Sequence, residues 1–116
     1  MSYFALSNGE KLYFEDTQKG DQTIIMLHGW TSSHEVYAPT IPAISEKARC
    51  ITYDHRGHSL SKDANREDVT MDTLASDLNE LISSFDLHNV TLLGWSMGAG
   101  VVMNYTALYG CEALRQ

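Results

Sequence analysis

Three short stretches of the chain are apolar at nearly every position. They are residues 24–27, 50–53 and 90–93. Continuous apolar runs of this length, bounded by polar segments, are typical of strands that are buried on both faces of a parallel sheet. We therefore expect three strands of one such sheet at these positions.

A different pattern precedes these runs. Residues 3–6 and 11–15 flank an Asn-Gly pair, and Asn-Gly favours the tight turn of a β-hairpin because both positions tolerate positive φ. In the second strand of this hairpin, Leu12 and Phe14 alternate with three residues that we expect to face water. These three are Lys11, Tyr13 and Glu15.

Helical periodicity appears between and after the runs. Apolar side chains recur on one side of residues 71–85, which predicts an amphipathic helix that Thr70 can cap. A proline suited to a first helical turn predicts a short helix over residues 42–47. The last helix is expected to cover residues 99–109 and to end near Gly110, since glycine is favoured just after a helix.

The order of these elements is a hairpin followed three times by a strand and a helix. This order predicts an α/β fold with a mostly parallel sheet behind an antiparallel start. The chain has no repeat, no low-complexity tract and no internal linker, so residues 1–116 are expected to form a single domain. The polar segment 61–68 is expected to be a surface loop.

Composition narrows the classes of protein. A net charge of −7 without a basic cluster argues against a nucleic-acid partner. No apolar run approaches the roughly 20 residues that cross a bilayer, and the N-terminus lacks the pattern of a secretory signal. Cys50 and Cys111 have no paired spacing, so neither a metal site nor a disulfide framework is expected. These features favour a cytoplasmic protein without a membrane partner.

The chemistry is concentrated around one serine. Gly94 and Gly98 stand two positions before and after Ser96, between the apolar run 90–93 and the helix 99–109. A strand that turns sharply into a helix holds its turn residue in a strained conformation, and glycines at this spacing avoid collisions. This is the pattern of a nucleophile elbow, so Ser96 is the expected nucleophile of a serine hydrolase.

Acyl transfer also needs donors for the developing oxyanion, and removing one donor typically lowers the rate by ~10²–10³. One expected donor is the backbone N–H of Met97, directly after the nucleophile. The second is expected from the loop that follows residues 24–27. There Gly29 allows a close approach, and the N–H of Trp30 faces the site.

Three segments together carry a resemblance to a known family. They are His28-Gly29-Trp30, Asp54-His55-Arg56-Gly57-His58-Ser59 and Gly94-Trp95-Ser96-Met97-Gly98-Ala99-Gly100. They resemble the α/β-hydrolase fold, most closely the arylesterases and cofactor-free haloperoxidases (perhydrolases), with enol-lactone hydrolases close behind. The resemblance implies Ser96 as nucleophile, Trp30 and Met97 as oxyanion hole, ester-like substrates such as carboxylic esters, lactones or peracids, and no cofactor. His58 departs from the pattern, which usually has a second glycine there.

Several polar residues have structural interpretations. We expect His28 to hold the oxyanion loop in place and Asp54 to form an ion pair with Arg56. Asp54, His55 and His58 have side chains that can bind a metal, but three ligand types within five residues of one polar loop are weak evidence for a metal site. No metal is expected.

The resemblance also implies an acid and a histidine base after later strands, in the order Ser, acid, His. Only residues 111–116 follow Gly110, and in the family this stretch leads into the next strand. The domain is therefore expected to be incomplete, truncated before the later strands. His88 is expected at the opposite end of the sheet, and no other histidine is expected within reach of Ser96 or beside an orienting carboxylate.

Three functional hypotheses follow. The first is a serine hydrolase that is active when a separate or later C-terminal segment supplies acid and base. The second is a catalytically inert truncated hydrolase that acts as a dimerising or binding module, and the third is a self-contained small esterase with an unusual base. The run 90–93 is expected at an open sheet edge, which favours a homo-oligomer or association with a C-terminal segment.

Overall fold

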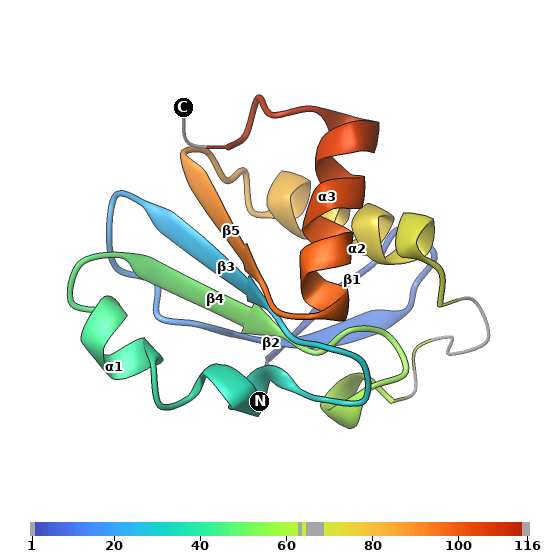
Figure 1. The fold of residues 1–116 in the computed structure, drawn as a ribbon, viewed down its shortest axis with the longest axis horizontal. Coiled ribbons are helices and arrows are strands. Elements are labelled where there is room, and N and C mark those ends of the chain that lie inside the picture. The colour runs from blue at the N-terminus through green and yellow to red at the C-terminus, as the bar shows by residue number, and fades with distance from the viewer. Residues whose placement is uncertain (1, 63, 65–68, 115–116) are drawn as a thin grey trace.

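The structure, a computed structural model, describes residues 2–62, 64 and 69–114. Its centre is a five-stranded sheet in the order β1-β2-β4-β3-β5 (Figure 1). The strands are β1 (Ser2–Ala5), β2 (Lys11–Asp16), β3 (Thr23–Leu27), β4 (Arg49–Tyr53) and β5 (Val90–Gly94). β1, β2 and β4 pair in antiparallel fashion, whereas β4, β3 and β5 run parallel. The α/β class, the N-terminal hairpin and the three parallel strands are confirmed.

The register of the parallel strands aligns their carboxyl ends. Leu27 of β3 lies opposite both Tyr53 of β4 and Gly94 of β5. The loops that begin at His28, Asp54 and Trp95 therefore leave the same edge of the sheet, side by side. In open α/β sheets this edge is where ligands bind.

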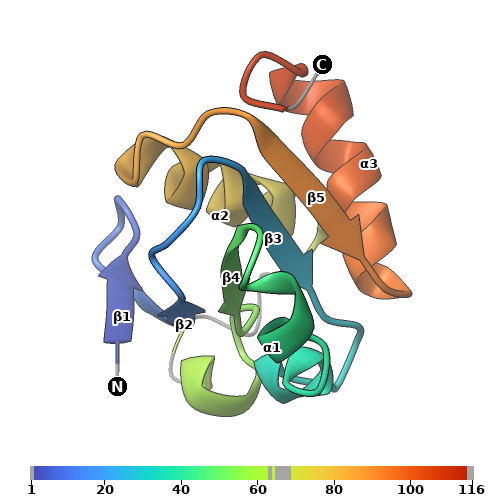
Figure 2. The ribbon, with the colours of Figure 1, turned by 90° about the vertical axis from the view of Figure 1, so that its left-hand side faces the viewer.

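The helices cover both faces of the sheet. They are α1 (Ile41–Ile44), α2 (Met71–Ser84) and α3 (Met97–Tyr109), with two 3₁₀ turns, η1 (His34–Tyr37) and η2 (Ser59–Ser61). α2 and α3 lie together on one face, and α1 lies on the other (Figure 2). The strand β3 serves both faces: Ile25 and Leu27 belong to the large core beneath α2 and α3. Its Met26 packs with Tyr37 and Cys50 in a smaller core on the other side.

The helix boundaries follow their capping residues. The hydroxyl of Thr70 accepts a hydrogen bond from the N–H of Thr73, 3.1 Å away, which confirms it as the cap of α2. Gly110 ends α3 with φ of 79°, as expected for a residue after a helix. The helix predicted over residues 42–47 is shorter. It ends at Ile44, and Ser45 donates its N–H to Ile41 in the last turn.

Of the three residues of β2 predicted to face water, Lys11 and Glu15 are exposed, but Tyr13 is buried. Its ring packs edge-on to Tyr3 and lies 5.0 Å from the ring of His34. Its hydroxyl donates to Glu15 at 2.7 Å, and this hydrogen bond is the main reason that the pKa of Tyr13 rises to about 12. An amphipathic tyrosine side chain can thus occupy the face that alternation assigns to solvent.

The strand β5 lies at the edge of the sheet, as expected, but it is not buried on both faces. Val90 is fully buried, whereas Leu93 remains 42% exposed. Beyond α3 the chain returns to this edge, where Leu114 forms a parallel bridge with Val90 (Figure 1). The N–H of Val90 donates to the carbonyl of Ala113 at 2.9 Å.

The polar segment 61–68 begins inside the fold rather than on its surface. Ser61 is buried, and its hydroxyl accepts from the N–H of Tyr13 and donates to the carbonyl of Asp54. Residues 63 and 65–68 of this segment lie outside the described part of the chain. In the described residues, no helix is long and apolar enough to cross a bilayer.

Candidate functional site

Ser96 forms the turn between β5 and α3. Its backbone has φ of 57° and ψ of −118°, a region that residues with a side chain rarely occupy. The residue is exposed, at the point where α3 begins. A strained residue presented to solvent at the N-terminus of a 13-residue helix is the geometry expected of the elbow.

The flanking glycines are required by close backbone packing. A Cβ atom on Gly98 would collide with the carbonyl groups of Leu27 and His28 at the end of β3. A Cβ atom on Gly94 would collide with the backbone of Gly98 itself. The turn therefore fits against the central strand only when both positions are glycine.

The loop after β3 lies directly against this turn. A Cβ atom on Gly29 would stand 3.2 Å from Cβ of Ser96 and 2.9 Å from the Trp95 ring. The next residue, Trp30, is 58% exposed. Thr31 has φ of 63°, which is unusual for a β-branched residue, and the N–H of Ser32 donates to Gly29 at 3.1 Å to close the turn.

Two backbone donors border the exposed serine. Met97 is the first residue of α3, so its N–H has no acceptor within the helix. Within the described part of the chain, neither this N–H nor that of Trp30 donates to a protein acceptor. Both donors thus remain available to a ligand.

The loop after β4 is organised differently, since its polar groups are buried and paired. Asp54 is fully buried, and its carboxylate accepts three hydrogen bonds. Two come from the backbone N–H and Nδ1 of His34, at 2.7 and 2.8 Å, and the third comes from the N–H of Leu60 at 3.1 Å. The predicted Asp54–Arg56 ion pair is wrong, because these donors already occupy the carboxylate.

Arg56 pairs instead with Asp77 on α2. Two parallel hydrogen bonds of 2.8 Å join the guanidinium to the carboxylate, and both side chains are buried. Burial raises the pKa of Asp77, and the hydrogen bond from Arg56 opposes that rise. The sequence held a signal for this pair: Asp77 interrupts the apolar stripe of α2, at helical spacing from Leu74 and Leu81.

Three histidines pack together beneath the loop after β3. The ring of His28 lies 4.4 Å from that of His55 and 5.2 Å from that of His58. His28 Nδ1 donates to the carbonyl of Gly29 at 2.7 Å, while its Nε2 accepts from the N–H of His55 at 3.1 Å. These contacts anchor the loop, in agreement with the structural role expected for His28.

Two of these imidazoles are held neutral. Burial lowers the pKa of His28 and lowers that of His55 to about 3. His55 Nε2 donates to the carbonyl of His28 at 3.1 Å, but Nδ1 has no partner among the described groups. A neutral ring tolerates this arrangement, whereas a protonated Nδ1 would be a buried donor without an acceptor.

The pair His34–Asp54 corrects one expectation, because this histidine does stand beside an orienting carboxylate. The other ring nitrogen of His34 lies 3.5 Å from a carboxylate oxygen of Glu15 on β2. Ser96 follows β5, on the opposite side of the β4–β3 pair. His34 is thus directed away from Ser96, and no described hydrogen bond joins the Ser96 hydroxyl to a base.

In the loop after β4, the backbone conformation at His58 does not require a glycine. His58, expected to replace a glycine, has φ of −114°, which any residue adopts. The left-handed residues are its two neighbours, Gly57 and Ser59, with φ of 76° and 45°. Among the described residues, no three His, Cys, Asp or Glu side chains are grouped to hold a metal, and this includes Asp54, His55 and His58.

These features define a class of protein. Residues 22–114 match the family described as alpha/beta hydrolase fold, and the chain belongs to this family. The strand order, the turn at Ser96 and the glycine-dependent packing against β3 are the physical basis of that membership.

Particular relatives are esterases and haloperoxidases. A solved esterase from Exiguobacterium antarcticum matches 97% of this chain with 35% identity and a TM-score of 0.89. A solved bromoperoxidase from Bacillus anthracis matches 91% with 35% identity and a TM-score of 0.81. A non-heme chloroperoxidase of Kitasatospora aureofaciens is 31% identical over 93% of the chain. The chain spans about two fifths of these relatives, since it covers 42%, 38% and 39% of their lengths.

Proposed function

We propose that this chain carries the nucleophile and oxyanion hole of a serine hydrolase that acts on carboxylic esters or related lactones and peracids. One observation carries the proposal: Ser96 is held exposed at φ of 57° and ψ of −118° in a strand-to-helix turn that only glycine neighbours permit. Strain of this kind at a surface serine has no structural benefit, and such residues cluster at active sites.

The reaction follows from the atoms around the turn. The hydroxyl oxygen of Ser96 attacks the ester carbonyl, its proton passes to a base, and the C–O bond to the alcohol breaks to leave an acyl-enzyme. Water then hydrolyses the acyl-enzyme and regenerates the serine. The N–H groups of Trp30 and Met97, which have no described acceptor, would stabilise the oxyanion in both steps.

The base and the acid are expected from another segment. The described histidines beside β4 are engaged in the buried loop, and His34 is directed toward β2. We propose that a C-terminal segment or a second copy of the chain associates through the open edge of β5 and completes the site. The exposed Leu93 and the bridge to Leu114 support this edge as the place of association. Cys50 and Cys111 form no disulfide in the described structure, which fits a cytoplasmic location.

A fluorophosphonate probe tests the nucleophile. With a C-terminal segment from a relative added to supply the base, we expect covalent labelling of the chain, measured by intact mass, and its loss in Ser96→Ala. Ser84→Ala removes an exposed serine from the end of α2 and serves as the matched control, which should label like the parent. Absence of labelling, even with an added C-terminal segment from a relative, would favour the alternative of an inert module that dimerises or binds a partner.

Light scattering tests the association. Because an open apolar edge strand tends to pair with another chain, we expect a species heavier than the 13.0 kDa monomer. A monodisperse monomer across the micromolar range would contradict self-association and leave only a separate segment as the partner.

A further inference from the structure

The loop that carries Trp30 is held at both of its ends. At the first end the ring of His28 donates to the carbonyl of Gly29 at 2.7 Å. At the other end stands His34, the first residue of η1. Between these ends Thr31 has φ of 63°, and a strained residue persists only where the surrounding structure holds it. The position of the Trp30 N–H therefore depends on how firmly His34 is held.

His34 is bound to a single carboxylate oxygen through two hydrogen bonds. Its backbone N–H donates to Oδ1 of Asp54 at 2.7 Å, and its ring Nδ1 donates to the same oxygen at 2.8 Å. Any residue except proline can supply the first bond, whereas the second needs a side chain with a donor at the place of Nδ1. The imidazole therefore doubles the attachment of the loop to Asp54.

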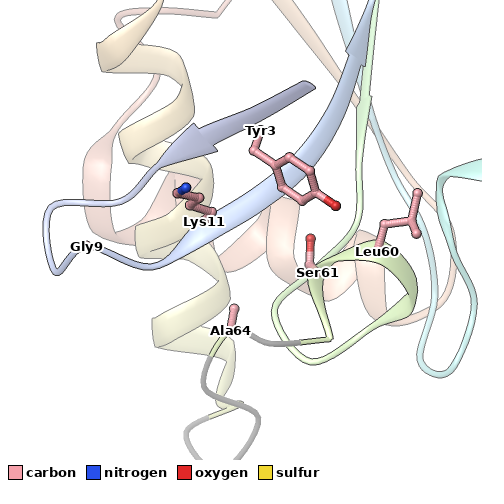
Figure 3. Close-up of a pocket in the computed structure, with 6 residues that line it drawn as sticks. All are labelled: Tyr3, Gly9, Lys11, Leu60, Ser61 and Ala64. Carbon is pink, nitrogen blue, oxygen red and sulfur yellow. The ribbon is translucent and has the colours of Figure 1, made fainter. Parts of the chain in front are cut away.

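Asp54 is held in place by further hydrogen bonds. Its N–H donates to the carbonyl of Tyr13 at 3.0 Å, and its own carbonyl accepts from the hydroxyl of Ser61 at 2.8 Å. Oδ2 accepts from the N–H of Leu60 at 3.1 Å. Figure 3 shows Leu60 and Ser61 in η2, beside the hairpin. The acceptor of His34 is thus fixed to both β2 and η2.

The other side of the His34 ring is also in contact with the protein. Nε2 lies 3.5 Å from a carboxylate oxygen of Glu15, and the ring of Tyr13 lies 5.0 Å away. The hydroxyl of Tyr13 donates to the same oxygen of Glu15 at 2.7 Å. The imidazole is buried, so contacts on both sides hold it in one orientation. A ring held in this way can fix the loop, which a freely rotating side chain could not do.

We propose that His34 is a positioning residue for the oxyanion hole. Its two hydrogen bonds to Asp54 fix the loop after β3, so that the N–H of Trp30 stays beside Ser96. The inference rests on the proposed reaction at Ser96, because this donor has a role only when an oxyanion forms there. His34 acts through the loop, and it neither contacts the substrate nor accepts the proton of the serine.

The expected size of the effect follows from the geometry of an oxyanion hole. Removing one donor outright typically lowers the rate by ~10²–10³. Loss of the hydrogen bond from Nδ1 of His34 would displace the Trp30 N–H rather than remove it, and a misplacement of about 1 Å can cost about 10²-fold in rate. We therefore expect the loss of this bond to lower the rate about 10- to 100-fold.

Two amide side chains distinguish the nitrogens of the His34 ring. The amide nitrogen of asparagine lies near the place of Nδ1 and can donate to Asp54, whereas that of glutamine lies near the place of Nε2 and faces Glu15. The measurement is the second-order rate of fluorophosphonate labelling, with a C-terminal segment from a relative added to supply the base. The rate should fall about 10- to 100-fold in His34→Gln and stay within about 3-fold of the parent in His34→Asn.

Two more variants complete the series. His34→Leu fills similar space but has no donor, so its labelling rate should match that of His34→Gln. His88→Gln makes the same change at an exposed histidine and should label like the parent.

A second measurement follows the loop itself, by two-dimensional NMR of the chain. The backbone amide signal of Trp30 should shift in His34→Gln and stay near its parent position in His34→Asn. The amide of Val101, which is fully buried in α3, serves as the reference and should stay in place in both variants. A general loss of structure would move both signals, so it is distinguished from a displaced loop.

The outcomes separate this inference from the proposed reaction. A parent rate of labelling in both His34→Gln and His34→Leu would overturn the role of His34 and leave Ser96 as the nucleophile. Equal losses in His34→Gln and His34→Asn would also overturn it, because the ring would then matter for packing and not for its bond to Asp54. Absence of labelling in the parent, with the segment added, would refute the reaction at Ser96, and the inference would fall with it.

Discussion

Two loops leave the same edge of the sheet, and they use similar residues in opposite ways. The loop after β4 holds Asp54, His55 and Arg56, all buried, with the acid and the guanidinium fully engaged by partners. The turn after β5 presents Trp95 and Ser96 to solvent in a strained backbone. The loop after β4, which has more titratable groups, therefore has a structural role, and the turn after β5 is the candidate for chemistry.

The two loops are expected to affect stability in opposite ways. A buried polar group stabilises a fold only when its hydrogen bonds are complete, so replacing it should be costly. A strained exposed residue lowers stability, so replacing it by glycine should be favourable. If the comparison is correct, substitutions in the two loops will change the free energy of unfolding with opposite signs.

The largest effect is expected for Asp77→Ala. Removing the carboxylate takes away the partner that neutralises the buried Arg56 guanidinium, and breaking a buried pair lowers the free energy of unfolding by about 3–5 kcal/mol. Urea denaturation measures this loss. The exposed Asp21→Ala should have little effect. The double variant Arg56→Met, Asp77→Leu should recover most of the loss, and failure to do so would show that the pair does more than satisfy two buried charges.

Acidification should destabilise the same loop. The pKa of His55 is about 3 in the folded protein and 6.5 as a reference, so the unfolded chain binds more protons between these values. Stability from this group is therefore complete above pH 6.5 and declines as the pH falls, by about 2 kcal/mol at pH 5. His28 acts in the same direction, because burial lowers its pKa as well.

The pH dependence is checked by urea denaturation between pH 5 and 7.5. His55→Gln should flatten the slope of stability against pH, whatever it does to stability at neutral pH. His88→Gln, which alters an exposed histidine at the other end of the sheet, should leave the slope unchanged. Equal slopes in all three proteins would show that His55 is not the responsible group.

The turn after β5 is expected to respond with the opposite sign. Ser96→Gly relieves the backbone conformation at φ of 57° and should raise the free energy of unfolding by about 1 kcal/mol, while it abolishes labelling by fluorophosphonate. Ser96→Ala keeps a Cβ atom and should leave stability nearly unchanged. If the glycine and alanine variants are equally stable, the strain argument for the site fails.

The smallest effect is expected at Ser59, which is strained although it belongs to the buried loop after β4. Ser59 has φ of 45°, so Ser59→Gly should stabilise the protein by about 0.5 kcal/mol in thermal unfolding. His58→Gly, at φ of −114°, should instead destabilise it because a packed ring is lost. The reverse result would restore His58 as the glycine-like position.

Sequence patterns predicted the fold well because the relevant signals are local. The apolar runs locate β3, β4 and β5 to within one residue, and Asn-Gly locates the hairpin. The turn at Ser96 was also predictable because its two glycines mark it in the sequence. Gly94 packs against Gly98 within the turn, although Gly98 itself packs against Leu27 and His28 of a distant segment.

The errors concern contacts between distant segments. Arg56 and Asp77 meet only because α2 docks on the loop after β4, and adjacency in sequence wrongly favoured Asp54. Tyr13 is buried by His34, which belongs to a loop beyond the next strand. The partial exposure of β5 likewise follows from its position at the edge, which the apolar pattern of a strand cannot encode.

The strand order also has a consequence for how the chain folds. The central strand β3 pairs with β4 and β5, and both of these strands follow it in the chain. Ile25 can pair with Ile51 and Leu92 only after those residues have been synthesised. These pairings close long loops, so they form late and slowly. During synthesis β3 emerges before both of its partners and keeps at least one apolar edge unpaired until residue 94 has left the ribosome, which makes this interval the most vulnerable to aggregation.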